Sequence, residues 1–175
     1  PLFRSSYQQG AVIDSLGVMV SQQAYDKDVQ VVNKTGDINI GKLSSSDLDI
    51  KLTTGDIKVS QANNIIASLT TGDVEINQAN KAIITGTTGD IDVDQTNIVK
   101  VKLTTGDITL GDVDESLDLT STTGDIKIDT VNLKASSSIK NGTGDVKIRK
   151  TTNCYIDAKT KIGDTRVNNN DRKSD

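Results

Sequence analysis

Hydrophobic and polar residues alternate along most of this chain in short segments. After each of several glycines, the second and fourth residues are apolar and the residue between them is polar, as in residues 57–59 and 91–93. Apolar residues with the same spacing of two also precede the glycines, as in residues 48–52. This period is typical of β-strands that bury one face. The pattern therefore predicts two short β-strands per repeat, one on each side of the glycine.

The dipeptide Gly-Asp marks the repeat. It occurs eight times, and successive copies are 17–20 residues apart. The glycines are Gly36, Gly55, Gly72, Gly89, Gly106, Gly124, Gly144 and Gly163. Gly17 lies 19 residues before Gly36 and resembles a degenerate first copy without the Asp. A short and nearly constant period of this kind indicates a stacked repeat architecture.

We therefore predict an all-β fold, a single-stranded parallel β-solenoid (β-helix) of about 8–9 coils with about 17–20 residues per coil. Equivalent residues of successive coils would stack about 4.8 Å apart in columns. Glycine suits one corner of each coil, and we expect the Asp beside it to bind a backbone N–H of its own corner. Asn63 and Asn80 suit the other corner, where stacked amides can bond along the column. The short coils leave the handedness open.

The chain divides into three parts on this interpretation. Residues 1–28 hold three of the four aromatic residues and no Gly-Asp, so we assign them to an N-terminal cap or irregular segment. Residues 29–167 form the β-solenoid repeats, and residues 168–175 form a wholly polar C-terminal tail. A cap has a physical reason, because an uncovered rung exposes the edge of a parallel sheet.

A recurring motif, Thr-Thr-Gly-Asp-Ile-x-Val, resembles that of a known family. It occurs with small variations in residues 53–59, 70–76, 87–93 and 104–110. The motif resembles the bacterial adhesin-like β-strand-repeat family called Toastrack and is similar to the head-GIN adhesins. The resemblance implies a bacterial module of the cell envelope, often beside a membrane anchor or a stress-sensing region. It implies no catalytic residues, and fold alone does not define a function.

Composition excludes several classes of function. The chain has no histidine, so it holds no Ser-His-Asp or Cys-His nucleophile pair and no histidine-ligated zinc. One cysteine permits no internal disulfide. Tyr155 is the only aromatic residue within the regular coils, and no loop is long enough to build a cleft. We therefore expect no enzyme, no cofactor and no catalytic residue.

Hydropathy bears on where the protein acts. No uncharged apolar run approaches the roughly 18 residues of a membrane span. We expect neither a membrane span nor a signal peptide or anchor within these residues. Together with the family resemblance, this favours a bacterial extracytoplasmic location, in the cell envelope or secreted.

The column of Gly-Asp aspartates raises an alternative. Stacked carboxylates supply the oxygen ligands that Ca²⁺ prefers. Calcium β-rolls, however, use a glycine-richer nonapeptide, so we predict that the column binds no metal. Asp92 and Asp94 are a carboxylate pair of the kind that carbohydrate-active solenoids need. A Ca²⁺-dependent or carbohydrate-binding solenoid therefore stays as the alternative function.

Charge is distributed unevenly along the chain. Residues 1–125 hold 9 basic and 18 acidic residues, whereas residues 126–175 hold 11 basic and 6 acidic residues. In a solenoid these segments become two ends of a rod, so we predict an interaction surface for an unknown protein or an anionic envelope component at the C-terminal end. The candidate residues are Lys127, Lys140, Lys147, Arg149, Lys150, Lys159, Lys161 and Arg166. Nucleic acid is not expected, because the isoelectric point is about 4.8.

Overall fold

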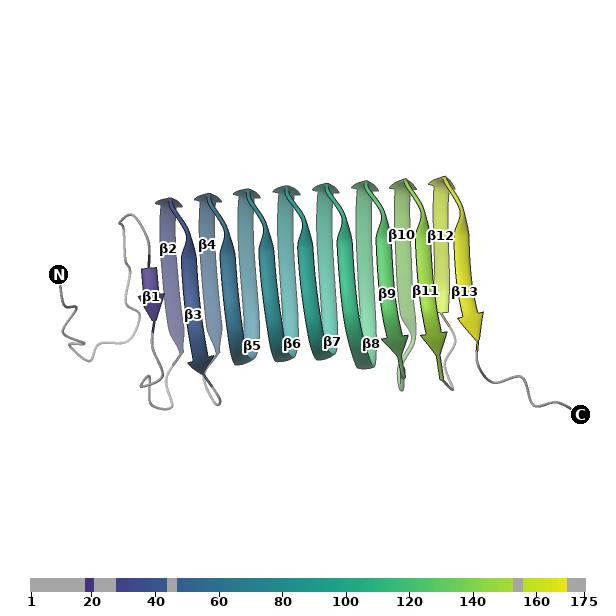
Figure 1. Ribbon diagram of the computed structural model, residues 1–175, viewed down its shortest axis with the longest axis horizontal. Coiled ribbons are helices and arrows are strands. Elements are labelled where there is room, and N and C mark those ends of the chain that lie inside the picture. The colour runs from purple at the N-terminus through teal and green to yellow at the C-terminus, as the bar shows by residue number, and fades with distance from the viewer. Residues whose placement is uncertain (1–17, 21–27, 44–46, 153–155, 170–175) are drawn as a thin grey trace, which may run out of the picture.

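The computed structural model describes residues 18–20, 28–43, 47–152 and 156–169 (Figure 1). All regular structure in these ranges is β-strand. The strands are β1 (Val18–Val20), β2 (Val29–Thr35), β3 (Ile38–Leu43), β4 (Leu48–Thr54), β5 (Ile57–Thr71), β6 (Val74–Thr88), β7 (Ile91–Thr105), β8 (Ile108–Thr123), β9 (Ile126–Val131), β10 (Ser137–Thr143), β11 (Val146–Thr151), β12 (Ile156–Ile162) and β13 (Thr165–Asn169). They wind into an elongated solenoid with β1 and β13 at opposite ends (Figure 1).

Every described strand pairs in parallel with its equivalent in a neighbouring coil. The segments that follow the Gly-Asp pairs form one face, which we call the post-glycine face, in the order β1-β3-β5-β6-β7-β8-β9-β11-β13. The segments that precede the Gly-Asp pairs form the pre-glycine face, from β2 through β4 to β12. The long strands β5 to β8 curve through the second corner and belong to both faces (Figure 1).

The structure confirms the predicted all-β parallel solenoid. Eight Gly-Asp corners lie along it, so the chain completes seven turns between Gly36 and Gly163. Residues 18–20 form a further rung, in which Val18 pairs with Ile38 and Val20 with Ile40. The other residues of segment 1–28, apart from Asp28, lie outside the described residues. So do residues 170–175 of the tail.

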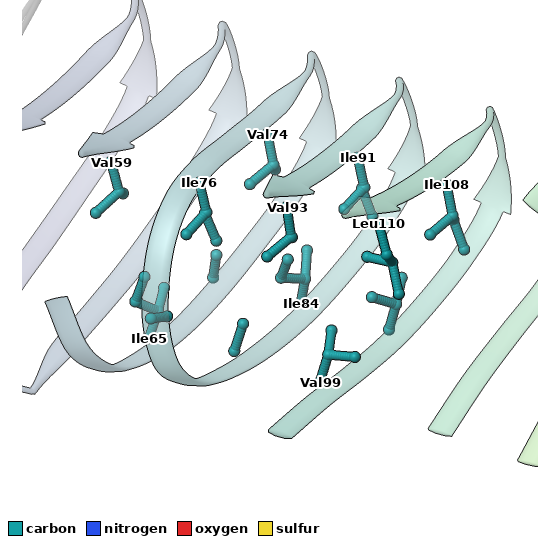
Figure 2. Packing of buried hydrophobic residues seen from close by; sticks show 14 of the residues in the cluster. Val59, Ile65, Val74, Ile76, Ile84, Ile91, Val93, Val99, Ile108 and Leu110 are labelled. Atoms are coloured by element: carbon teal, nitrogen blue, oxygen red, sulfur yellow. The ribbon is translucent and has the colours of Figure 1, made fainter. Parts of the chain in front are cut away.

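Apolar columns fill the space between the two faces. Val74, Ile91 and Ile108 occupy equivalent positions in successive coils and point inward (Figure 2). Each is no more than 1% exposed, and so is Val101 on the opposite face. This confirms the predicted register, in which Ile91 and Val101 face the core. Because nearly every buried position is aliphatic, a chain that is only 34% hydrophobic can still build a continuous core.

The first corner depends on glycine. All eight Gly-Asp glycines have positive φ, between 108° and 134°. A Cβ atom on Gly72 would overlap the carbonyl oxygen of Gly55 in the preceding coil. Each corner is also hydrogen-bonded to the next, as where the N–H of Gly55 donates to the carbonyl oxygen of Thr71 at 3.1 Å. Only a residue without a side chain combines this backbone conformation with this close stacking.

The Gly-Asp aspartates form a ladder between coils, and this corrects one expectation. The Oδ1 atom of Asp73 accepts a hydrogen bond from the backbone N–H of Asp90 at 2.7 Å, not from its own corner. Asp56 Oδ1 likewise accepts the backbone N–H of Asp73 at 2.9 Å, and the same bond recurs in each coil up to the N–H of Asp164. The carboxylates therefore fix the spacing between neighbouring coils. The expectation was wrong because parallel stacking brings the backbone N–H of the next coil's aspartate within hydrogen-bond distance of each carboxylate.

None of the described residues belongs to a helix of the length and hydrophobicity that crossing a membrane requires.

Candidate interaction surface

Three of the predicted basic residues stack in one column of the post-glycine face. Lys127 pairs in register with Lys147, and Lys147 pairs with Arg166. All three side chains point outward and are exposed. Arg149 lies two residues after Lys147, on the same outward-pointing parity, and is also exposed. The C-terminal coils of this face therefore present a basic strip.

Other predicted residues lie on the pre-glycine face. Lys140 pairs in register with Lys159, and Lys161 follows two residues later along β12. Lys150, by contrast, lies at the end of β11, a strand of the post-glycine face, where the chain approaches the second corner. The eight candidates are thus gathered in the last coils of the rod, but they are divided between its two faces. A flat partner can contact only one of these faces at a time.

Neighbouring carboxylates neutralise half of the candidate cations. Lys127 Nζ lies 3.4 Å from Asp107 Oδ2 and 3.8 Å from Asp125 Oδ2, so it bridges two rungs of the aspartate ladder. The other pairs are Arg149 with Asp129 at 3.1 Å, Lys159 with Asp157 at 2.9 Å and Arg166 with Asp164 at 3.3 Å. These exposed pairs reduce the charge that the four residues offer to a partner.

The remaining four candidates keep their charge. Lys140, Lys147, Lys150 and Lys161 are exposed and form no ion pair within the part of the chain that the structure describes. They belong to β10, β11 and β12, the last strands before the C-terminal rung. These lysines are the centre of the candidate surface.

The middle of the post-glycine face is acidic. Asp92 pairs in register with Glu75 and lies two residues from Asp94. Partial burial, followed by the charges of Asp94 and Glu75, raises the pKa of Asp92. Glu75 in turn forms an ion pair with Lys58 at 2.8 Å, and this hydrogen bond and the carboxylate charge raise the pKa of Lys58. Acidic and basic parts of this face therefore follow one another along the rod.

A shallow groove, which the sequence analysis did not single out, runs along the second corner. It encloses about 360 Å³ and is lined by two columns of amides with carboxylates at one end. The columns are Gln61, Gln78 and Gln95, and Asn63, Asn80 and Asn97, and the carboxylates are Asp112 and Asp114. The sequence does contain an indication of this groove, because glutamine recurs six residues after Gly55, Gly72 and Gly89.

The two amide columns differ in their hydrogen bonds. Asn97 Nδ2 donates to Asn80 Oδ1 at 2.9 Å, as expected for stacked amides. Asn63 departs from this pattern, because it donates to Asp47 Oδ1 at 3.3 Å. The glutamines stack in register, yet within the described residues their amides form no hydrogen bond with one another. They offer donors and acceptors at the spacing of one coil.

Carboxylates are the obvious ligands for a metal ion on this surface. In the aspartate ladder from Asp37 to Asp145, one oxygen of each carboxylate already accepts a backbone N–H, as Asp73 Oδ1 does. The described ranges hold no group of three or more acidic or cysteine side chains placed to bind a metal ion. Asp92 and Asp94 lie on an open sheet face, and only Asp94 borders a second shallow hollow, beside Asp112 and Asp129.

A family model matches the coils that carry this surface. The Toastrack DUF4097 model aligns with residues 46–175, which is most of the chain. The chain belongs to the Toastrack family. The predicted Toastrack resemblance is therefore confirmed, and seven of the eight Gly-Asp corners, from Gly55 to Gly163, lie within the matched residues. Comparison with curated proteins and with solved structures gave no match.

Proposed function

We propose that this Toastrack domain is a non-catalytic interaction or structural module of the bacterial cell envelope. It acts outside the cytoplasm, in an adhesin-like role or in association with envelope stress, and its C-terminal coils bind an anionic partner. The family membership supports a β-solenoid module. The envelope location is a proposal that rests on the family resemblance, and the anionic partner is a proposal that rests on the arrangement of charge.

One observation carries the proposal. Lys140 and Lys161 are exposed on the pre-glycine face, Lys147 and Lys150 are exposed on β11, and all four lack ion-pair partners within the described residues. Single surface charges contribute little, but several charges on a rigid support act together on a polyanion. The continuous ladders of the solenoid provide that rigidity. A phosphate-rich polymer or lipid headgroup surface has the matching chemistry.

Co-sedimentation tests this proposal. The purified chain is mixed at low salt with vesicles of phosphatidylglycerol and phosphatidylcholine, and separately with teichoic acid attached to cell-wall fragments. The two arms distinguish a lipid headgroup from a wall polymer, which share phosphate chemistry. We expect binding in at least one arm, and we expect it to fall steeply as salt is raised to about 0.5 M, where charges are screened within a few ångströms.

A matched pair of variants locates the surface. Lys147→Glu/Lys150→Glu/Lys161→Glu reverses three unpaired charges of the C-terminal coils and should reduce binding about tenfold or more. The control, Lys34→Glu/Lys51→Glu/Lys102→Glu, makes the same change in net charge on exposed lysines of earlier coils and should retain most of the binding. Equal losses in both variants, or no binding by the original chain, would refute the proposed surface.

Carbohydrate binding is a second candidate, and the groove at the second corner favours it. The amides of Gln61, Gln78 and Gln95 repeat at the spacing of one coil and are not used within the described part of the fold. Side-chain amides and carboxylates both hydrogen-bond to hydroxyl groups. Titration of the chain with purified peptidoglycan glycan strands, compared with Gln78→Ala/Gln95→Ala, tests this candidate. Heat of binding that the variant retains would exclude the groove.

A further inference from the structure

The post-glycine face carries opposite charges at matching distances from one point. One outward column of this face consists of exposed residues that pair in register through successive coils. They are, in order, Glu75, Asp92, Thr109, Lys127, Lys147 and Arg166. The centre of this column lies between Thr109 and Lys127. Carboxylates therefore lie on one side of the centre, and cations lie on the other.

A second outward column repeats this arrangement. Asp94 lies two residues after Asp92, and Arg149 lies two residues after Lys147, so each belongs to the same strand as its neighbour. Gly111 lies in a rung between them and has no side chain that would hold a facing molecule away. The face thus presents an acidic half and a basic half around one centre.

The inner charges of the two halves have no counter-ion close by. Asp92, Asp94 and Lys147 form no ion pair within the part of the chain that the structure describes. Partial burial, and then the charges of Asp94 and Glu75, raise the pKa of Asp92. Three rungs, about 14 Å, separate Asp92 from Lys147, so the two cannot meet within one chain. A lysine or arginine that pairs with Asp92 therefore comes from another molecule.

A twofold axis through the centre of the column brings a second copy face to face with the first. The axis runs along the strand direction, so the two rods are antiparallel and each column lies opposite the same column in reverse order. Asp92 then lies opposite Lys147 of the second copy, and Asp94 lies opposite Arg149 of the second copy. Each contact occurs twice, as in any isologous interface.

The contact between unpaired groups contributes most to this arrangement. Arg149 and Arg166 already form ion pairs within their own chain, at 3.1 Å and 3.3 Å. They bring less charge to the interface, where Arg166 lies opposite Glu75 of the second copy. Asp92 and Lys147 bring their full charges. The twofold arrangement therefore depends chiefly on these two residues.

Like charges meet at the border of the interface. The Gly-Asp aspartates lie at the first corner, where Asp107 faces Asp125 of the second copy and Asp90 faces Asp145. Lys127 Nζ lies 3.4 Å from Asp107 Oδ2 and 3.8 Å from Asp125 Oδ2, so it neutralises the central pair. Asp90 and Asp145 are exposed, and each already accepts a backbone N–H through Oδ1. Solvent and salt at this corner screen their repulsion.

We propose that the post-glycine face binds a second copy of this chain in an antiparallel, face-to-face dimer, in which Asp92 of each copy pairs with Lys147 of the other. The shared rungs extend about 25–30 Å along the rod and about 16 Å across it, so the dimer buries roughly 900 Å² in total. Interfaces of this size are weak and transient, and we expect a dissociation constant of tens of micromolar.

This inference goes beyond the proposed function, because the partner is the chain itself. The dimer covers Lys147 but leaves Lys140 and Lys161 exposed on the pre-glycine face. A second copy and an anionic partner therefore compete for the post-glycine face alone.

Sedimentation velocity of the purified chain tests the dimer. Measurements at about 10–200 µM bracket the expected dissociation constant. We expect a dimer that forms with rising concentration at low salt and dissociates at about 0.5 M salt, where surface charges are screened.

Charge exchange tests the contact itself. Asp92→Lys and Lys147→Asp each place like charges opposite one another at two points, and each should weaken the dimer about tenfold or more. An equimolar mixture of these two variants restores opposite charges at both points and should form a mixed dimer. The double variant Asp92→Lys/Lys147→Asp should form a dimer with itself. The control Lys102→Asp makes the same charge change on the pre-glycine face and should dimerise as the original chain does.

Four results would overturn the inference. They are no dimer at low salt up to about 200 µM, equal weakening by Lys102→Asp and Lys147→Asp, no association in the mixture of the two single variants, and species that grow beyond a dimer as concentration rises. Circular dichroism confirms that each variant is folded. Asp92→Lys keeps all the predicted basic residues and should still co-sediment with vesicles or wall fragments. Failure of the dimer is therefore distinguishable from failure of the proposed function.

Discussion

Replacement of Gly72 by alanine tests the physical basis of the Gly-Asp corner. Gly72 has a φ of 134°, which residues with a side chain rarely adopt. Its Cβ would also overlap the carbonyl oxygen of Gly55 and lie 3.2 Å from Asp56 Oδ1. The overlapping atom belongs to the backbone, so it cannot rotate away as a flexible side chain would. Either the corner changes conformation or the two coils move apart.

The expected cost follows from these two effects. Backbone strain at such a φ costs about 1–3 kcal/mol. Moving the coils apart weakens the hydrogen bond from Gly55 to Thr71, at 3.1 Å, and the one from Asp73 to Asp56, at 2.9 Å. Each contributes about 1 kcal/mol net. We therefore expect Gly72→Ala to lower the free energy of unfolding by about 3–5 kcal/mol, a large share of the 5–15 kcal/mol typical of a domain.

Gly86→Ala is the matched control. Gly86 lies in β6, the strand that follows Gly72. It is buried, and its φ lies outside the left-handed region. Its Cβ would meet only side-chain ends, Leu103 Cδ1 at 2.9 Å and Leu69 Cδ2 at 3.4 Å. These leucine ends can shift, and alanine removes some of the entropy cost of glycine. We expect a change of less than about 1 kcal/mol.

Urea unfolding followed by circular dichroism measures both variants. The shift in the midpoint for Gly72→Ala should exceed that for Gly86→Ala several-fold. Similar midpoints for the two variants would refute the reasoning, because they would show that neither the positive φ nor the stacked carbonyl constrains the corner.

Three further predictions concern the core and the carboxylates. Ile91→Ala should lower the free energy of unfolding by about 2–5 kcal/mol, measured in urea, because it leaves a cavity in a buried column. A loss no larger than that of Thr109→Ala, at an exposed position, would contradict the register. Asp73→Ala should lower the free energy of unfolding by about 1 kcal/mol, because the N–H of Asp90 loses its acceptor. Asp73→Asn keeps an acceptor oxygen and should lose much less. Millimolar Ca²⁺ should not shift the melting temperature of the unaltered chain. The raised pKa of Asp92 means that its contribution to stability is present below the ordinary pKa and is lost as pH rises through the raised value. Asp92→Asn should therefore be more stable than the original chain at neutral pH, by less than about 1 kcal/mol, and equal to it near pH 3; a gain that persists in acid would refute the linkage.

Local pattern was enough to predict the columns of this fold. Alternation on each side of Gly-Asp identifies which residues face inward, and the near-constant period is sufficient to align Lys127, Lys147 and Arg166 in one column. This works because parallel strands in register place equivalent residues side by side, so a position in the repeat becomes a position in space. Division of the basic residues between two faces also follows from whether they precede or follow the glycine, although the charge pattern was interpreted as a single basic end.

Contacts between coils do not follow from the pattern. Lys127 reaches Asp107 and Asp125, which precede it by different distances along the chain, and these ion pairs decide which cations keep their charge. The groove along the glutamine column likewise depends on how sharply β5 to β7 curve at the second corner.

The architecture of this protein follows from its residue pattern, whereas its surface chemistry depends on contacts between coils. Period-two alternation and eight Gly-Asp pairs suffice for a parallel solenoid with known inward and outward positions, because these properties depend only on backbone geometry and burial. Which donor an aspartate serves depends on atoms one coil away. Asp73 could bond within its own corner or to Asp90, and only the rise and stagger between stacked coils place the N–H of Asp90 within 2.7 Å of its carboxylate.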